Sequence, residues 1–308
     1  MLHLRVLCPA ETTGAVRSLL LDEPGATHVT VLSGAAVQPP GDVLEATLTR
    51  ECGDGLLTAL LDLGLDKSGG ITLEEIDTVL SEAADAAEEA VPGDPADAVI
   101  WEELVGRTGE DSRLTFSFVA FLTIACLLAA IGAITNSPVT VVGAMVLGPE
   151  FGPLAALAVA VVLRRSDLAR TAGLALAVGF LVAVVITVLA ASVFRATGLL
   201  TAEQIVDTSQ VDFIYEVGPF SLIIALLAGA AGMLSLTSAK SGALVGVFIS
   251  VTTVPAVAFV AVGAVEGEWG RALSSLAQLV VNLVGIVAAA VAVLWLNPST
   301  RTQSRRGC

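Results

Sequence analysis

The sequence has few of the side chains from which most catalytic and metal sites are built. It contains two histidines, His3 and His28, and four cysteines without a Cys-x-x-Cys spacing. A zinc centre needs more nitrogen and sulfur ligands than these supply. Neither a phosphate-binding glycine loop nor a serine–histidine–aspartate set can be recognised. We therefore expect no enzyme activity, no metal site and no cofactor, and we expect free thiols in a reducing compartment.

Charged residues are also scarce, and they are unevenly placed. They make up 15% of the chain, against about a quarter of an average soluble domain. Of the 30 acidic residues, 22 lie within 1–113 beside six Lys or Arg, whereas the remaining part holds eight acids and nine bases. The first third is therefore acidic and polar, and the rest is apolar. Such an acidic domain has no surface that could neutralise phosphates, which excludes nucleic acid as a partner.

The first 75 residues have the patterns of a small α+β domain. Residues 2–8 alternate between apolar and polar positions as a half-buried strand does, and Glu23-Pro24-Gly25 ends the helix that follows. The expected order is strand 2–8, helix 11–22, strand 27–33, strand 43–50, helix 53–65 and strand 71–73. This βαββαβ order predicts a ferredoxin-like domain over 1–75, with helices on one sheet face and the other face open.

The open sheet face offers a candidate ligand site. We expect it to carry Arg5, His28, Glu45 and Thr47, which are side chains able to bind a polar metabolite. A nucleoside or nucleotide is the first candidate, by analogy with ferredoxin-like regulatory domains of the PII and ACT kinds. The alternative is a solvated face or a subunit interface. The same analogy predicts a homo-oligomer, with a trimer as the first choice.

The rest of the chain predicts a bundle that spans a membrane. Two helices at 76–91 and 97–108 form a connector over 76–110, and a membrane domain follows over 111–298. Six apolar segments are each near the roughly 20 residues that a helix needs to cross hydrocarbon: 114–134, 138–163, 168–194, 218–236, 241–265 and 271–296. Connections rich in Lys and Arg then face the cytoplasm together with both termini, including the tail 299–308. We expect the protein to lie in the inner membrane of a bacterium.

Two of these segments are interrupted. Gly148-Pro149-Glu150-Phe151-Gly152-Pro153 breaks the second, and Thr252-Thr253-Val254-Pro255 breaks the fifth. A carboxylate inside a membrane is costly and usually functional, so Glu150 predicts a proton or cation site, the alternative being a cap on a half-helix. When the sequence is aligned with itself so that residues 142–143 match 245–246, Glu150 matches Thr253. This internal alignment predicts two inverted three-helix halves.

Other polar groups lie in or beside the apolar segments. Asn136 precedes the second segment, and Asn282 lies in the sixth, one helical turn after Gln278. Buried amides of this kind hydrogen-bond across helices. With Glu150, Thr252 and Thr253, the two asparagines complete the predicted membrane site.

A known family has a similar signature. The run from Asn136 to Pro153, NSPVTVVGAMVLGPEFGP, resembles that of the bacterial uncharacterised hydrophobic domain family, "domain of unknown function 389", as do 246–255 and Val281-Asn282. The resemblance covers about 110–296, and the N-terminal arrangement is similar to the actinobacterial branch. It implies an integral membrane protein with a small cytosolic domain, and no activity.

Together these features predict a channel or secondary transporter regulated by a ligand-binding cytosolic domain. The alternatives are a membrane sensor that binds the ligand without conducting anything, and a scaffold.

Overall fold

A computed structural model describes residues 1–95, 98–201, 218–238 and 253–297. The chain divides into two compact units, Met1–Glu103 and Leu104–Cys308. The predicted boundaries at 75, 110 and 298 stay predictions. Helix α5, at Trp101–Asp111, crosses the division between the two units.

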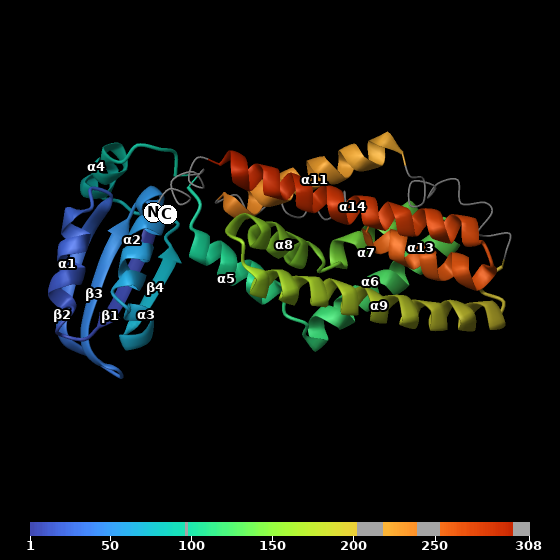
Figure 1. The fold of residues 1–308 in the computed structure, drawn as a ribbon, viewed down its shortest axis with the longest axis horizontal. Helices are drawn as coiled ribbons and strands as arrows, with labels where there is room; N and C mark the ends of the chain where they lie inside the picture. The colour runs from blue at the N-terminus through green and yellow to red at the C-terminus, as the bar shows by residue number, and fades with distance from the viewer. Residues whose placement is uncertain (96–97, 202–217, 239–252, 298–308) are drawn as a thin grey trace. The chain divides into compact units, whose positions relative to one another are not determined.

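The first unit is a small antiparallel sheet with helices (Figure 1). Its strands are ordered β2-β3-β1-β4, and every neighbouring pair is antiparallel. The elements before α5 are β1 (Leu2–Cys8), α1 (Thr13–Asp22), β2 (Ala26–Val37), β3 (Pro40–Leu48), α2 (Arg50–Asp62), α3 (Leu65–Ser68), β4 (Gly70–Glu75) and α4 (Glu82–Ala90).

One face of the sheet forms the core of this unit. Leu2, Leu4 and Val6 of β1 alternate inward, and they pack with alternate residues of β3 and with the apolar sides of α1 and α2. Val16 and Leu20 of α1 are fully buried there. Alternation therefore located β1, because one face of this strand is buried and the other is partly exposed.

Several element boundaries differ from the predicted ones. Strand β2 continues to Val37 instead of ending at 33, so that a long hairpin leads into β3 at Pro40. Helix α2 begins at Arg50 instead of 53, because Thr49 is already extended and takes the N-cap position. Strand β3 accordingly ends at Leu48. A short helix, α3, follows α2 before the last strand.

The second unit consists of apolar helices. They are α6 (Phe116–Ile134), α7 (Pro138–Leu147), α8 (Phe151–Leu163), α9 (Ser166–Ala196), α11 (Pro219–Thr237), α13 (Thr253–Glu266) and α14 (Trp269–Leu296). In the described part of the chain, four are long and apolar enough to cross a membrane, or five when the bent pair α7 and α8 counts as one span. These helices indicate a multi-pass membrane protein. The predicted fifth segment, 241–265, lies partly outside the described residues.

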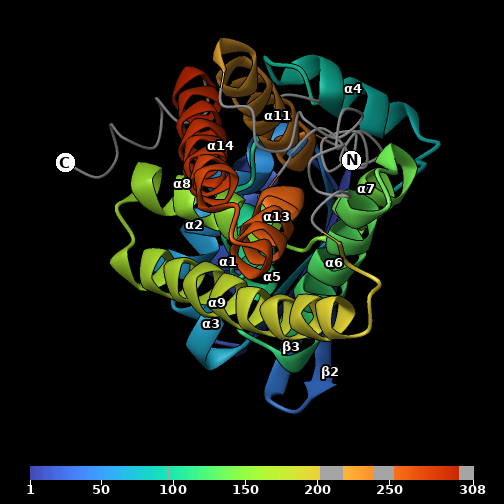
Figure 2. The ribbon, with the colours of Figure 1, turned by 90° about the vertical axis from the view of Figure 1, so that its right-hand side faces the viewer.

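Helix α13 is the centre of this bundle. It contacts α6, α9 and α14, which Figure 2 shows around it. All of its residues from Thr253 to Gly263 are buried except Val260, as expected of a helix that is apolar all round. Helix α8 packs on both α9 and α14, so that each of the two inner helices contacts both long ones.

Glycines let several of these helices approach closely. A Cβ on Gly229 of α11 would meet the backbone of Ile286 in α14, and one on Gly285 would meet Ala225. In the same way, Gly179 of α9 accommodates Phe118 of α6. Small residues at helix contacts are typical of membrane bundles, where close packing stabilises association in place of the hydrophobic effect.

Candidate functional site

The break between α7 and α8 follows directly from the local sequence. Helix α7 begins with Pro138 in its first turn, and it ends before Gly148 and Pro149. A residue before proline disfavours helical backbone, and Gly148 is extended. The two helices are bent by 52° at this point. The break creates a new helix N-terminus inside the second unit.

Glu150 occupies that N-terminus. It is the N-cap residue of α8 and is 5% exposed. Its Oε1 accepts a hydrogen bond of 2.5 Å from the Thr253 hydroxyl, whereas its Oε2 has no hydrogen-bond partner among the described residues. A Cβ on Gly148 would collide with this carboxylate and with Val254, so that glycine leaves the space for it. A buried carboxylate with one oxygen unpaired is costly to stability, and an ionisable group of this kind within apolar helices is usually retained for a function.

Thr253 is brought to Glu150 from the other half of the unit. It is fully buried and begins α13, whose third residue is Pro255. Proline suits the first turn of a helix, because no intrahelical partner exists there for the missing N–H. The carboxylate therefore lies beside the first turns of two helices, and both ends favour negative charge. The two positions that the internal alignment superposed are in direct contact.

Asp111, which the sequence reading did not single out, lies at the same helix end. A Cβ on Gly152, in the first turn of α8, would meet the Cβ of Asp111, the last residue of α5. Burial raises the pKa of the Asp111 carboxyl, while Arg107 lowers it and Glu110 raises it. Asp111 is exposed, whereas Glu150 is buried. The only sequence signal was its position as the last acid before the apolar segments.

The other predicted membrane residues are placed as follows. Asn136 has a positive φ of 48° in the turn between α6 and α7. Asn282 is 3% exposed within α14, one turn after Gln278, whose Oε1 has no hydrogen-bond partner in the described ranges. Thr252 lies outside the described residues. Among the predicted residues that the structure describes, Thr253 is the one that hydrogen-bonds Glu150.

The predicted ligand residues of the sheet lie in two places, the β1–β3 ladder and a bulge of β2. Arg5 and Glu45 are cross-strand partners on the face away from the core, and they form an ion pair of 3.6 Å. Thr47 lies beside His3 on the same face and is 8% exposed. His28 lies in a bulge of β2 with φ of 53°, and its Nε2 is 3.0 Å from the Ser81 hydroxyl. Ligand binding at this face stays a prediction.

The family comparison matches the helical unit. Residues 145–288 match the family described as Domain of unknown function (DUF389). The chain is similar to this family over that stretch. The match begins three residues before Gly148 and ends within α14.

The matched stretch contains Glu150, Thr253 and Asn282, whereas Asn136 and Asp111 lie before it. The chain is similar to "Uncharacterized protein MJ0678" of Methanocaldococcus jannaschii, with 24% identity over 206 residues. That alignment covers 67% of this chain and 62% of the archaeal protein, so the chain spans less than two thirds of this relative. No solved structure matches the chain.

Proposed function

We propose that the DUF389-like stretch of this chain binds a proton at Glu150 and moves it, as a channel or secondary transporter of the bacterial inner membrane. The acidic ferredoxin-like unit lies in the cytoplasm and regulates this activity by binding a small ligand. The observation that carries the proposal is the buried Glu150 carboxylate, which has one oxygen bonded to Thr253 and one oxygen without a hydrogen-bond partner in the described part of the chain.

The ligands around Glu150 favour a proton over a metal ion. Hard cations require about six oxygen ligands. Among the described residues, hydrogen bonding brings a single hydroxyl to this carboxylate, and no group of three acidic, histidine or cysteine side chains is present that could hold a metal ion. A proton needs only the carboxylate and a route to it. Asp111, exposed at the first turn of α8, is suited to pass protons toward Glu150.

The packing of the bundle supports a transporter-like architecture. Helix α8 follows the break after α7, and helices α8 and α13 each pack on both α9 and α14. This arrangement is expected of two inverted halves that share a site where their broken helices meet. In such folds the two halves rock against each other around that site, which exposes it to each side of the membrane in turn.

The experiment is proton flux through liposomes that contain the full chain. A potassium diffusion potential drives the flux, and a pH-sensitive dye inside the liposomes reports it. We expect flux above that of empty liposomes, loss of at least about ten-fold in Glu150→Gln, and a smaller loss in Thr253→Val. Glu268→Gln is the matched control, because Glu268 also precedes a helix but is exposed.

Two results would contradict the proposal. Wild-type flux equal to that of empty liposomes would leave a non-conducting sensor or a scaffold. Equal flux in wild type and Glu150→Gln, with both proteins eluting as folded protein, would show that Glu150 is not on the proton path.

The orientation of the chain in the membrane has its own test. A reporter active only in the cytoplasm should work after Arg306 and fail after Asp207, and activity at both sites would refute the six-span arrangement.

A further inference from the structure

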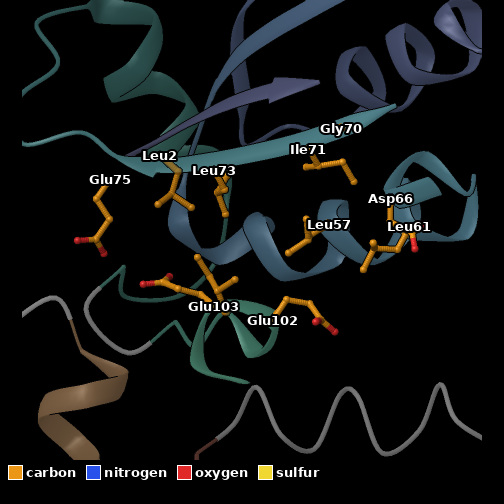
Figure 3. Close-up of a pocket in the computed structure, with 11 residues that line it drawn as sticks. Leu2, Leu57, Leu61, Asp66, Gly70, Ile71, Leu73, Glu75, Glu102 and Glu103 are labelled. Carbon is orange, nitrogen blue, oxygen red and sulfur yellow. The ribbon is translucent and has the colours of Figure 1, made fainter. Parts of the chain in front are cut away.

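The first unit contains a cavity that none of the predicted ligand residues lines. It has a volume of about 640 Å³, within the range of small-molecule sites. It lies between β4, α2 and the start of α5, at the edge of the sheet opposite β2 (Figure 3). Its lining consists of Leu2, Leu57, Leu61, Asp66, Gly70, Ile71, Leu73, Glu75, Ile100, Glu102 and Glu103.

The walls are apolar and incompletely covered. Leu57, Ile71 and Leu73 are only partly buried although they pack against the core, and Leu61 is also only partly buried. Figure 3 shows Leu57 and Leu73 pointing into the space between the strand and the helices. Apolar side chains left partly exposed in a concave site gain free energy when a ligand covers them, about 25 cal/mol for each Å² removed from water.

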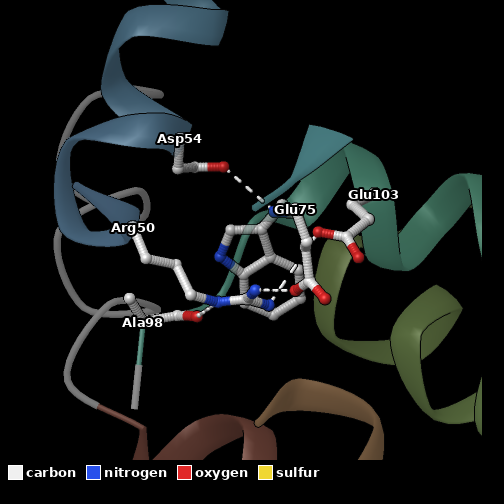
Figure 4. Close-up of polar contacts among 6 residues, drawn as sticks. Arg50, Asp54, Glu75, Ala98 and Glu103 are labelled. Carbon is white, nitrogen blue, oxygen red and sulfur yellow. Dashed lines mark hydrogen bonds and ion pairs between the residues drawn. The ribbon is translucent and has the colours of Figure 1, made fainter. Parts of the chain in front are cut away.

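The border of the cavity is negative. Four of its lining residues are carboxylates, and none is Lys or Arg. Arg50, which is 8% exposed, pairs with Glu75 and Glu103 and donates to the Ala98 carbonyl (Figure 4). Asp66 and Glu102 form no ion pair within the described ranges, and both are exposed.

We infer that this cavity binds a small amphipathic organic cation, an ammonium group on an apolar body. The apolar body fills the space between Leu57, Leu61 and Leu73, and the ammonium group lies at the border between Asp66 and Glu102. An anion is disfavoured there, because the lining holds four carboxylates and no Lys or Arg, and Arg50 beside it is already matched by two of these carboxylates. The strong negative charge of residues 1–113 adds long-range attraction for cations. This site does not depend on the proposed proton pathway.

The experiment compares three probes of one shape and different charge. Phenethylammonium, 2-phenylethanol and 3-phenylpropionate are titrated against the full chain in nanodiscs, with saturation-transfer NMR as the readout and empty nanodiscs as the blank. We expect saturable binding of phenethylammonium, with a Kd at least about five-fold lower than that of the alcohol, and weakest binding of the carboxylate.

Paired variants locate the site. Asp66→Asn with Glu102→Gln should raise the Kd of phenethylammonium about five-fold or more and leave that of the alcohol unchanged. Glu11→Gln with Asp22→Asn removes the same charge from exposed positions outside the cavity, and should change the Kd less than two-fold. Leu61→Asn should weaken the binding of both probes, because it removes an apolar side chain from the cavity wall.

Three outcomes would overturn the inference. They are the absence of saturable phenethylammonium binding above the blank, an unchanged Kd in the Asp66 and Glu102 double variant, and an equal loss in the Glu11 and Asp22 control. Each of these can occur whether or not the chain conducts protons, so failure here is distinguishable from failure of the proposed function.

Discussion

Substitution of Gly229 tests the contact between α11 and α14. In an isolated helix, Gly→Ala stabilises by up to about 1 kcal/mol, because alanine has the better helix propensity. At Gly229, however, the added methyl group would lie less than 3.0 Å from the carbonyl oxygen, Cα and carbonyl carbon of Ile286. These are backbone atoms of a helix, which cannot turn aside as the end of a side chain can. The two helices must therefore separate by on the order of 1 Å.

The magnitude follows from the cost of overpacking. Forcing one extra methyl group into a well-packed interior typically costs about 1–3 kcal/mol, which exceeds the propensity gain. With about 1 kcal/mol of propensity gain subtracted, the net cost is up to about 2 kcal/mol, so we expect Gly229→Ala to lower the Tm of the full chain in detergent by up to about 8 °C, at about 2–4 °C for each kcal/mol. Gly173→Ala in α9 is the matched control, since its Cβ would have no neighbour within 4 Å.

The Tm difference between Gly229→Ala and Gly173→Ala tests whether α11 and α14 approach closely. Gly173→Ala should keep or slightly raise the Tm, and it should bind the same amount of detergent and elute at the same volume as wild type. If Gly229→Ala melts at or above the temperature of Gly173→Ala, the close approach of α11 and α14 does not exist in the protein, and the packing described above for the second half of the bundle is wrong.

Three further predictions concern the first unit. Arg50→Met should cost about 1 kcal/mol and lower the Tm, because the two carboxylates that it pairs are each about half exposed and screened by water; an unchanged Tm would show that the cluster adds no stability. The Thr13 hydroxyl and the Gly34 N–H donate to Asp42 and lower its pKa. Its stabilising contribution is therefore complete above about pH 4 and is lost as pH falls through the lowered pKa, so the Tm of Asp42→Asn should decrease less than that of wild type between pH 5 and pH 3. Burial raises the pKa of the Cys52 thiol to about 11, so at pH 8 about one molecule in a thousand carries the thiolate, and mass spectrometry after brief iodoacetamide treatment should find Cys52 unmodified in the folded protein but alkylated after denaturation.

Local patterns in the sequence determined the elements of both units. Alternation of apolar residues located β1, and a long apolar run located α6 within two residues at its start. The break between α7 and α8 was readable because Gly148 and Pro149 act through their own backbones. The family could also be recognised, because its signature is a continuous stretch of sequence. In each case the cause lies within a few residues of its effect.

The contacts that make up the sites were decided by tertiary structure. Glu150 and Thr253 are 103 positions apart, and the internal alignment superposed them without implying that they touch. His28 lies in a bulge of β2 with a positive φ, and its contact with Ser81 joins residues 53 positions apart. Arg50 was predicted at the end of a strand, but it begins α2, and its buried guanidinium forms an ion pair with Glu75. The cavity beside it is lined by segments that come together only when the chain folds. Side-chain periodicity specifies which face of an element is buried, whereas the neighbour that covers it depends on how all the elements pack together.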